Sequence, residues 1–93
     1  MSKRKKNVFE QIGASPEEAA NLEARARLMI ILKQEIQKRH LSQVQAAKLL
    51  GVKPPRISEL MHGRIGKFSL DLLVSYLSRL GKRIEFKALK SAA

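Results

Sequence analysis

The sequence predicts a mainly α-helical fold, a compact bundle of helices that ends in one short β-strand. Three serine residues, Ser15, Ser42 and Ser69, each stand directly before a segment that carries helix signals. Strictly alternating polar and apolar residues occur near the C-terminal end, at 83–87, as in a half-buried strand. Aromatic residues make up 4% of the chain, so the core of this bundle must be built from aliphatic side chains.

The chain has 93 residues, which suffices for one domain with a modest core. We expect residues 1–7 to form a flexible basic tail and residues 8–93 to form that single domain. The longest apolar run, Leu28–Leu32, is five residues long, so we expect neither a membrane span nor a secretory signal. Cysteine is absent from the sequence, and a cytoplasmic location is the default expectation.

Two elements are expected in the N-terminal third. Residues Val8–Ile12 are short and partly alternating, and they fit either a strand or an ordered arm. A helix should then run from Ser15 to about Arg39, because Ser15 can cap it, Pro16 suits its first position and Glu18 completes a capping box.

Three shorter helices should follow, each ending at a glycine. They are expected at 43–50, 54–62 and 70–80, and their stops are Gly51, Gly63 and Gly81. Pro54 and Pro55 are tolerated at a helix start, because the first N–H groups have no partner within the helix. The expected core consists of the apolar residues of all four helices: Leu22, Leu28, Met29, Leu32, Ile36, Val44, Ala47, Leu49, Leu50, Ile57, Leu60, Leu70, Leu73, Leu77 and Leu80.

The predicted C-terminal strand places Ile84 and Phe86 on one face, and a lone strand needs a partner. It can pair with Val8–Ile12 of its own chain or with its copy in a second subunit. We favour the second arrangement, which makes the protein a two-fold homodimer.

The net charge is +11, and it is unevenly distributed. Residues 1–35 hold 7 Lys/Arg and 5 Asp/Glu, whereas residues 36–93 hold 12 and 3. Such an excess of one sign favours a polyanionic partner, and nucleic acid is the commonest one.

Residues Gln43–His62 carry the most informative spacing. Ala47 is small where the second helix must approach the third, Gly51 suits a positive φ at the turn between them, and Ile57 and Leu60 lie one turn apart to anchor the third helix. This pattern is typical of a helix-turn-helix, which presents its second helix to the DNA major groove.

The same stretch resembles the Xre/Cro-type helix-turn-helix regulators, with a lambda-repressor-like fold. The matching segments are Leu41-Ser42-Gln43, Ala46–Val52, Arg56–Leu60 and Gly63–Asp71, with Leu77, Leu80 and Gly81. The last two groups are similar to a small subgroup that includes HigA-like antitoxins. The resemblance covers about residues 8–89 and implies a regulator that binds double-stranded DNA.

The resemblance also implies which residues touch DNA. Base reading falls to the exposed face of the third helix, namely Lys53, Pro54, Pro55, Arg56, Ser58 and Glu59. Phosphate contacts are expected from Ser42, Gln43, His62, Arg64 and Lys67. Arg56 is the best candidate for a guanine contact, while Glu59 either accepts from a cytosine amino group or simply pairs with Arg56. The tail residues Lys3, Arg4, Lys5 and Lys6 either enter a minor groove or only keep the chain soluble.

One departure from the family pattern affects specificity. Relatives often carry Ser-Gln-Pro where this chain has Lys53-Pro54-Pro55, and Pro54 cannot replace the glutamine that reads adenine. Specificity at that base position is therefore either weak or carried by apolar contact with a thymine methyl group. Lys53 also replaces a capping residue, which leaves the first turn less well fixed.

Nothing in the sequence indicates catalysis, a cofactor or a metal site. His40 and His62 are the only histidines, and neither has paired carboxylates nearby. Together with the charge and the helix-turn-helix spacing, this makes a dimeric transcriptional repressor the leading hypothesis. The homodimer would place two copies of the third helix about one DNA turn apart on a palindromic operator. The alternative is an antitoxin that neutralises a partner toxin, through residues 8–35, and represses its own operon. A third hypothesis is a coactivator-like adaptor or an RNA-binding module. RNA binding is less favoured, because few aromatic side chains are available to stack on bases.

Overall fold

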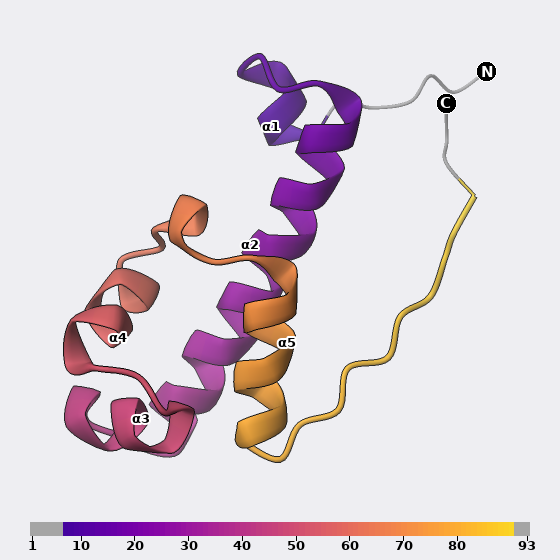
Figure 1. Ribbon diagram of the computed structural model, residues 1–93. Coiled ribbons are helices and arrows are strands. Elements are labelled where there is room, and N and C mark those ends of the chain that lie inside the picture. Colours follow the sequence, from indigo (N-terminus) through magenta and orange to yellow (C-terminus); the bar gives the residue numbers. More distant parts are fainter. Residues whose placement is uncertain (1–6, 91–93) are drawn as a thin grey trace.

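The computed structural model describes residues 7–90, which form five α-helices and one 3-10 helix (Figure 1). The α-helices are α1 (Val8–Gln11), α2 (Pro16–Lys38), α3 (Gln43–Leu50), α4 (Pro54–Met61) and α5 (Leu70–Arg79), and the 3-10 helix η1 (Ile65–Lys67) precedes α5. Within residues 7–90, no helix combines the length and the apolar character needed to cross a membrane. The predicted contacts of Lys3–Lys6 lie outside the described residues.

Helix α2 is the central element, and it contacts α1, α4, η1 and α5. Its 23 residues span about 35 Å. The predicted Ser15 cap and Pro16 start are confirmed, because the Ser15 hydroxyl accepts a hydrogen bond from the Glu18 N–H and Pro16 is the first helical residue. The predicted capping box is not formed, because the Glu18 carboxylate accepts from the Ser15 hydroxyl at 3.1 Å and not from the Ser15 N–H. The helix ends in a left-handed turn at His40, whose φ is 54°, where the Leu41 N–H donates to the Ile36 carbonyl at 3.2 Å.

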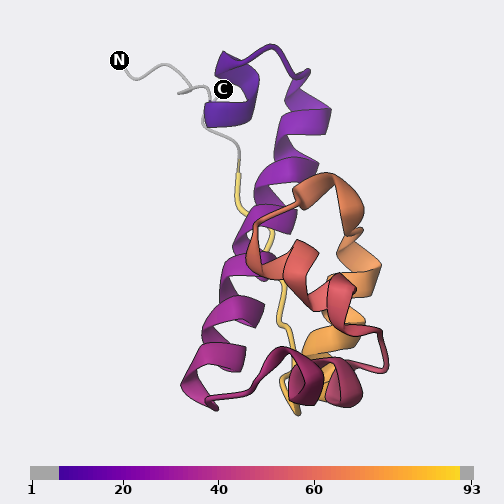
Figure 2. The same cartoon turned by 90° about the vertical axis from the view of Figure 1, so that its left-hand side faces the viewer.

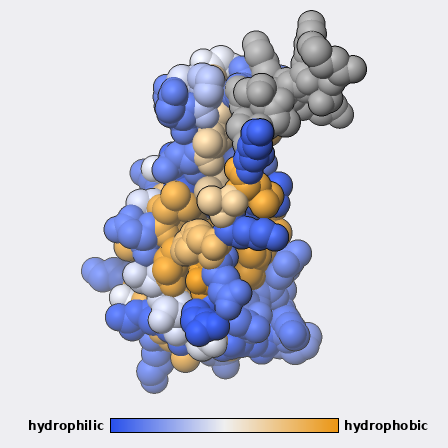
Figure 3. All heavy atoms as spheres, turned by 90° about the vertical axis from the view of Figure 1, so that its right-hand side faces the viewer, coloured by the Kyte–Doolittle hydropathy of each residue, from blue (hydrophilic) through white to orange (hydrophobic). Residues whose placement is uncertain are grey.

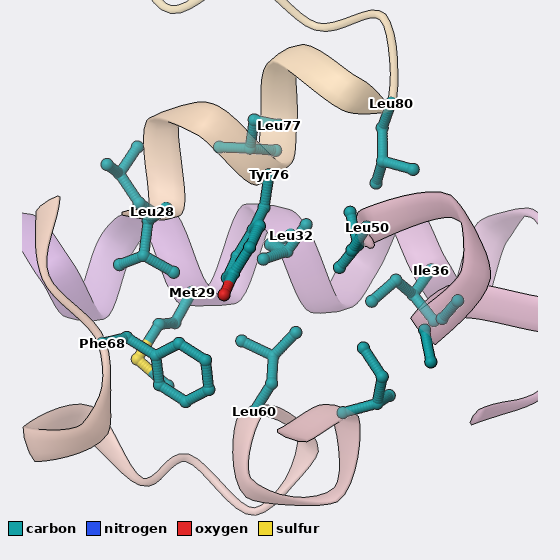
Figure 4. Close-up of a cluster of buried hydrophobic side chains, with 14 residues drawn as sticks. Leu28, Met29, Leu32, Ile36, Leu50, Leu60, Phe68, Tyr76, Leu77 and Leu80 are labelled. Atoms are coloured by element: carbon teal, nitrogen blue, oxygen red, sulfur yellow. The ribbon is translucent and has the colours of Figure 1, made fainter. Parts of the chain in front are cut away.

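The core lies between α2 and the layer formed by α3, α4 and α5 (Figure 4). Most of its predicted members are buried, with Phe68, Tyr76 and Ala46 in addition. On α3 the expected residues Ala47 and Leu50 are buried, whereas Val44 and Leu49 are exposed. The small alanine side chains allow α3 to pack closely on its neighbours, and Leu50 fills the core beside them.

The segment expected to be a strand or an arm, Val8–Ile12, is instead the short helix α1. Asn7 caps it, since its side chain accepts from the Glu10 N–H at 2.9 Å. The Asn7 amide also donates to the Glu23 carboxylate at 3.1 Å and thereby fixes α1 to α2. A local cap therefore decides the conformation of this segment.

The predicted C-terminal strand was wrong, because no β-strand exists among residues 7–90. The segment 83–90 is extended, but none of its backbone groups bonds to another backbone group of the described chain. A strand needs a neighbour, and the intrachain candidate is helical.

Ile84 and Phe86, the expected dimer-strand residues, border a shallow hollow of about 550 Å³ beside Ile31 and Leu70. Ile84 packs against the core, whereas Phe86 is 76% exposed. Figure 3 shows apolar side chains gathered on this side of the molecule, where the C-terminal segment runs. The alternating pattern at 83–87 therefore places Ile84 and Phe86 beside this hollow, but it does not indicate a strand paired in a sheet.

Candidate nucleic-acid interface

Helices α3 and α4 form a tight pair on one side of α2 (Figure 2). The turn between them depends on Gly51, whose φ of 70° confirms the predicted left-handed conformation. The Val52 N–H donates to the Ala47 carbonyl at 2.9 Å and closes the turn. A side chain at position 51 would be strained in this conformation, so glycine is the residue that allows this tight turn between the two helices.

Helix α4 is anchored along one edge and exposed along the other. Ile57 and Leu60 are each 1% exposed, as their spacing predicted. Lys53, Pro54 and Pro55 are exposed at the start of the helix. The helix therefore offers a surface to a partner while its core edge holds it in place.

The start of α3 is well ordered by a capping box. The Ser42 hydroxyl accepts from the Gln45 N–H at 3.1 Å, and the Gln45 side chain accepts from the Ser42 N–H at 2.8 Å. The Ser42 O–H can still donate, and Gln43 next to it is exposed. Both predicted phosphate ligands thus stand at the N-terminal end of α3, where the helix dipole favours an anion.

The start of α4 differs, because no side chain caps it. Lys53 makes no capping hydrogen bond, as its side-chain chemistry predicted, and the first two helical residues are prolines. Since proline has no N–H, this helix end offers little to a phosphate. Any contact between the start of α4 and a nucleic acid must therefore be made by side chains.

Arg56 is partly occupied inside the protein. Its guanidinium carbon lies 4.2 Å from the ring centroid of Phe68, which is buried. Its Nη1 also donates to the Glu59 carboxylate at 3.4 Å, and the Lys67 ammonium lies 3.9 Å from the other oxygen of Glu59. The structure thus brings three of the predicted DNA-contacting residues together, and it pairs Glu59 with cations.

The loop after α4 is held in place by Arg25, a residue of α2. Its Nη1 donates to the carbonyls of Ile65 at 3.2 Å and Phe68 at 3.4 Å, and its Nε donates to Asn21 at 2.7 Å. This loop carries the exposed cations Arg64 and Lys67. The sequence analysis missed the roles of Arg25 and Phe68, since no spacing pattern marks a side chain that contacts a distant carbonyl or a distant cation.

His62 folds back onto α4. Its Nδ1 lies 2.8 Å from the Ser58 carbonyl oxygen and 3.4 Å from the Ser58 hydroxyl. The residue is exposed, so its other ring nitrogen can meet solvent or a phosphate. Across residues 7–90, His, Asp and Glu side chains form no cluster of three that could hold a metal ion.

The charged side chains around α3 and α4 are almost all positive. Residues 40–69 contain five Lys or Arg residues and a single acid, Glu59, which is paired with Arg56 and Lys67. The remaining cations, Lys48, Lys53 and Arg64, are exposed. This positive field suits a phosphate backbone.

Comparison with known proteins agrees with this geometry. Residues 8–88 match the family model described as a helix-turn-helix domain. A solved structure assigned to the XRE family of transcriptional regulators superposes with a TM-score of 0.74 at 30% sequence identity, and the match covers 80% of this chain and 83% of that one. No curated protein matches the chain.

Proposed function

Because this chain belongs to the helix-turn-helix domain family, as an Xre-type DNA-binding transcriptional regulator, we propose that it represses transcription by placing α4 in the major groove of an operator. The observation that carries the proposal is the exposed face of α3 and α4, which carries the exposed cations Lys48 and Lys53, with Arg64 just beyond it. A repressor acts by occupying a site, which requires a binding surface and no chemistry.

Base contacts are assigned to the first turns of α4. Pro54 and Pro55 are exposed and apolar, so they suit thymine methyl groups, while Lys53 and Ser58 can donate to base acceptors. Arg56 is 27% exposed, and a guanine contact would use the part of its guanidinium that Phe68 and Glu59 leave open. Glu59, once Arg56 turns to a base, can accept from a cytosine amino group.

Phosphate contacts are assigned to both edges of this face. Ser42 and Gln43 at the start of α3 hold one strand, and His62, Arg64 and Lys67 beyond α4 hold the other. We further propose that two chains bind a palindromic operator, because one helix of eight residues covers only a half-site. The C-terminal segment, which carries the exposed residues Phe86 and Leu89, runs on the opposite side of the molecule from α3 and α4 (Figure 1), and this supports association through that side.

Fluorescence anisotropy with the gene's own upstream DNA tests the proposal. We expect binding that prefers this DNA to random duplex and weakens steeply with salt, with a footprint of two-fold symmetry. Gln43→Ala should weaken binding to all sequences alike, whereas Ser58→Ala should reduce the preference for the operator. Lys38→Ala, at the exposed end of α2, is the matched control and should change little. Equal affinity for random DNA would refute specific repression.

The alternative proposal is an antitoxin that contacts a toxin and represses its own operon. It is supported by Val8, Ile12 and Ile30, which are 61%, 78% and 53% exposed on α1 and α2. Three large apolar side chains in solvent on neighbouring elements favour a protein partner. Rescue of growth when the chain is co-expressed with the product of a neighbouring gene tests this role, and Ile12→Ser should abolish rescue while operator binding persists.

A further inference from the structure

A hollow of about 260 Å³ lies on α2 between α1 and the loop of η1. In Figure 1, α1 and η1 lie on the same side of α2, one beyond the other along the helix. Phe9 of α1 lines the hollow, as do Gly63 and Ile65 of the segment after α4. It is separate from the exposed face of α3 and α4.

The floor of this hollow is a stripe of α2 residues spaced by one turn. Ala26, Met29 and Ile30 supply an apolar surface, and Lys33 ends the stripe. From Ala26 to Lys33 the stripe is about 10 Å long. Its shape therefore suits a narrow apolar body with a polar group at one end.

Lys33 determines the chemistry of that polar group. Its side chain is half-buried, and it has no hydrogen-bond or ion-pair partner within residues 7–90. An ammonium beside an apolar surface favours an anion that can accept its hydrogen bonds. A carboxylate fits this position, and the apolar floor of the hollow suits a ligand whose remaining part is apolar.

We propose that this hollow binds a small carboxylate with an apolar body about as long as the stripe, such as a medium-chain fatty acid. The carboxylate pairs with the Lys33 ammonium, and the chain lies on Met29 and Ile30 beneath Phe9. This site goes beyond the proposed DNA-binding function and does not depend on it. The ligand touches Gly63 and Ile65, which flank Arg64, so it lies against the loop that the DNA-binding surface uses.

Titration of the ¹⁵N-labelled full chain with octanoate, followed by amide chemical shifts, tests the proposal. We expect saturable shifts at Phe9, Met29, Ile30, Gly63 and Ile65, with a Kd of about 1 mM. Octan-1-ol should bind roughly three- to tenfold more weakly, because it lacks the charge that pairs with Lys33. Acetate should not shift these amides, since it lacks the apolar body.

Lys33→Met provides the decisive comparison, because methionine favours helix and suits an apolar hollow. In this variant octanoate should lose its advantage over octan-1-ol, while Lys38→Met on the same helix should keep it. The net charge of +11 attracts any carboxylate weakly, so shifts that acetate also produces, or that Lys33→Met leaves unchanged, would overturn the proposal. Shifts confined to residues outside the hollow would also overturn it.

Discussion

The guanidinium of Arg56 lies over the ring of Phe68, with its central carbon 4.2 Å from the ring centroid. The pair joins α4 to the segment between η1 and α5, and Glu59 completes it through a hydrogen bond to Arg56. A residue expected to read a base is thus also a structural contact. Its replacement should therefore affect both stability and specificity.

Arg56→Met should lower the free energy of unfolding by about 0.5–1 kcal/mol, because the thioether keeps the apolar contact with Phe68 and loses the cation. Urea denaturation measures this change. Arg64→Met, on the exposed loop, is the control and should stay within about 0.5 kcal/mol of the parent. DNA binding should be measured in the same variants. If Arg56→Met weakens binding to operator and random DNA equally, Arg56 has a structural role only and does not read a base.

Gly51→Ala should destabilise the protein by about 1–2 kcal/mol, because a φ of 70° is costly for a residue with a Cβ atom. The added Cβ would also lie 3.0 Å from the Arg79 guanidinium, which can move aside. Gly66→Ala is the matched control, since its φ is not positive and open space surrounds it. Thermal unfolding of the two variants should separate them, and equal melting temperatures would contradict the assignment.

His40→Gly should stabilise the protein by about 0.5–1 kcal/mol. His40 ends α2 with a φ of 54°, a conformation that glycine adopts without strain. Gln37→Gly, one turn earlier in the regular helix, should instead destabilise it by a similar amount. The opposite signs of the two changes, measured by chemical denaturation, distinguish strain at His40 from a general effect of glycine.

Glu35 makes stability depend on acid. The hydrogen bond from Arg39, at 2.9 Å, holds the pKa of Glu35 below its ordinary 4.5, and the charges of Lys82, Arg39 and Lys38 lower it further. Because the folded pKa is the lower one, this stabilisation is complete above pH 4.5 and is lost as the pH falls through the folded pKa. The free energy of unfolding, measured by urea denaturation from about pH 7 to about pH 3, should fall less for Glu35→Gln than for the parent. Glu17→Gln, on the exposed first turn of α2, should keep the parent's decline.

Local chemistry explains what the sequence could predict. Ser15, Ser42 and Ser69 each cap the helix that follows, and Gly51 adopts the expected positive φ. These features depend on residues within one turn of each other, so they can be recognised from spacing alone. The anchoring of α4 by Ile57 and Leu60 follows from helical periodicity in the same way.

Contacts between distant residues explain what it could not predict. Alternation at 83–87 suggested a strand, but a strand depends on a neighbour that the described chain does not provide. Phe68 lies outside any periodic stripe, and its place under Arg56 depends on how the loop returns to α4. Arg25 donates a hydrogen bond to the carbonyl of Ile65, which is 40 residues away in the sequence, and no local sequence pattern predicts such a bond.

The two edges of α4 differ in what a substitution there would cost. Lys53, Pro54 and Pro55 are exposed, whereas Ile57 and Leu60 are each 1% exposed. Under the proposed function, substitutions at the outer positions would redirect the protein to a new target sequence at little cost in the free energy of folding. Arg56 is the exception, because a change there would also remove its contact with Phe68. If the gene is duplicated, the two proteins should therefore diverge more readily at Lys53, Pro54 and Pro55 than at Arg56.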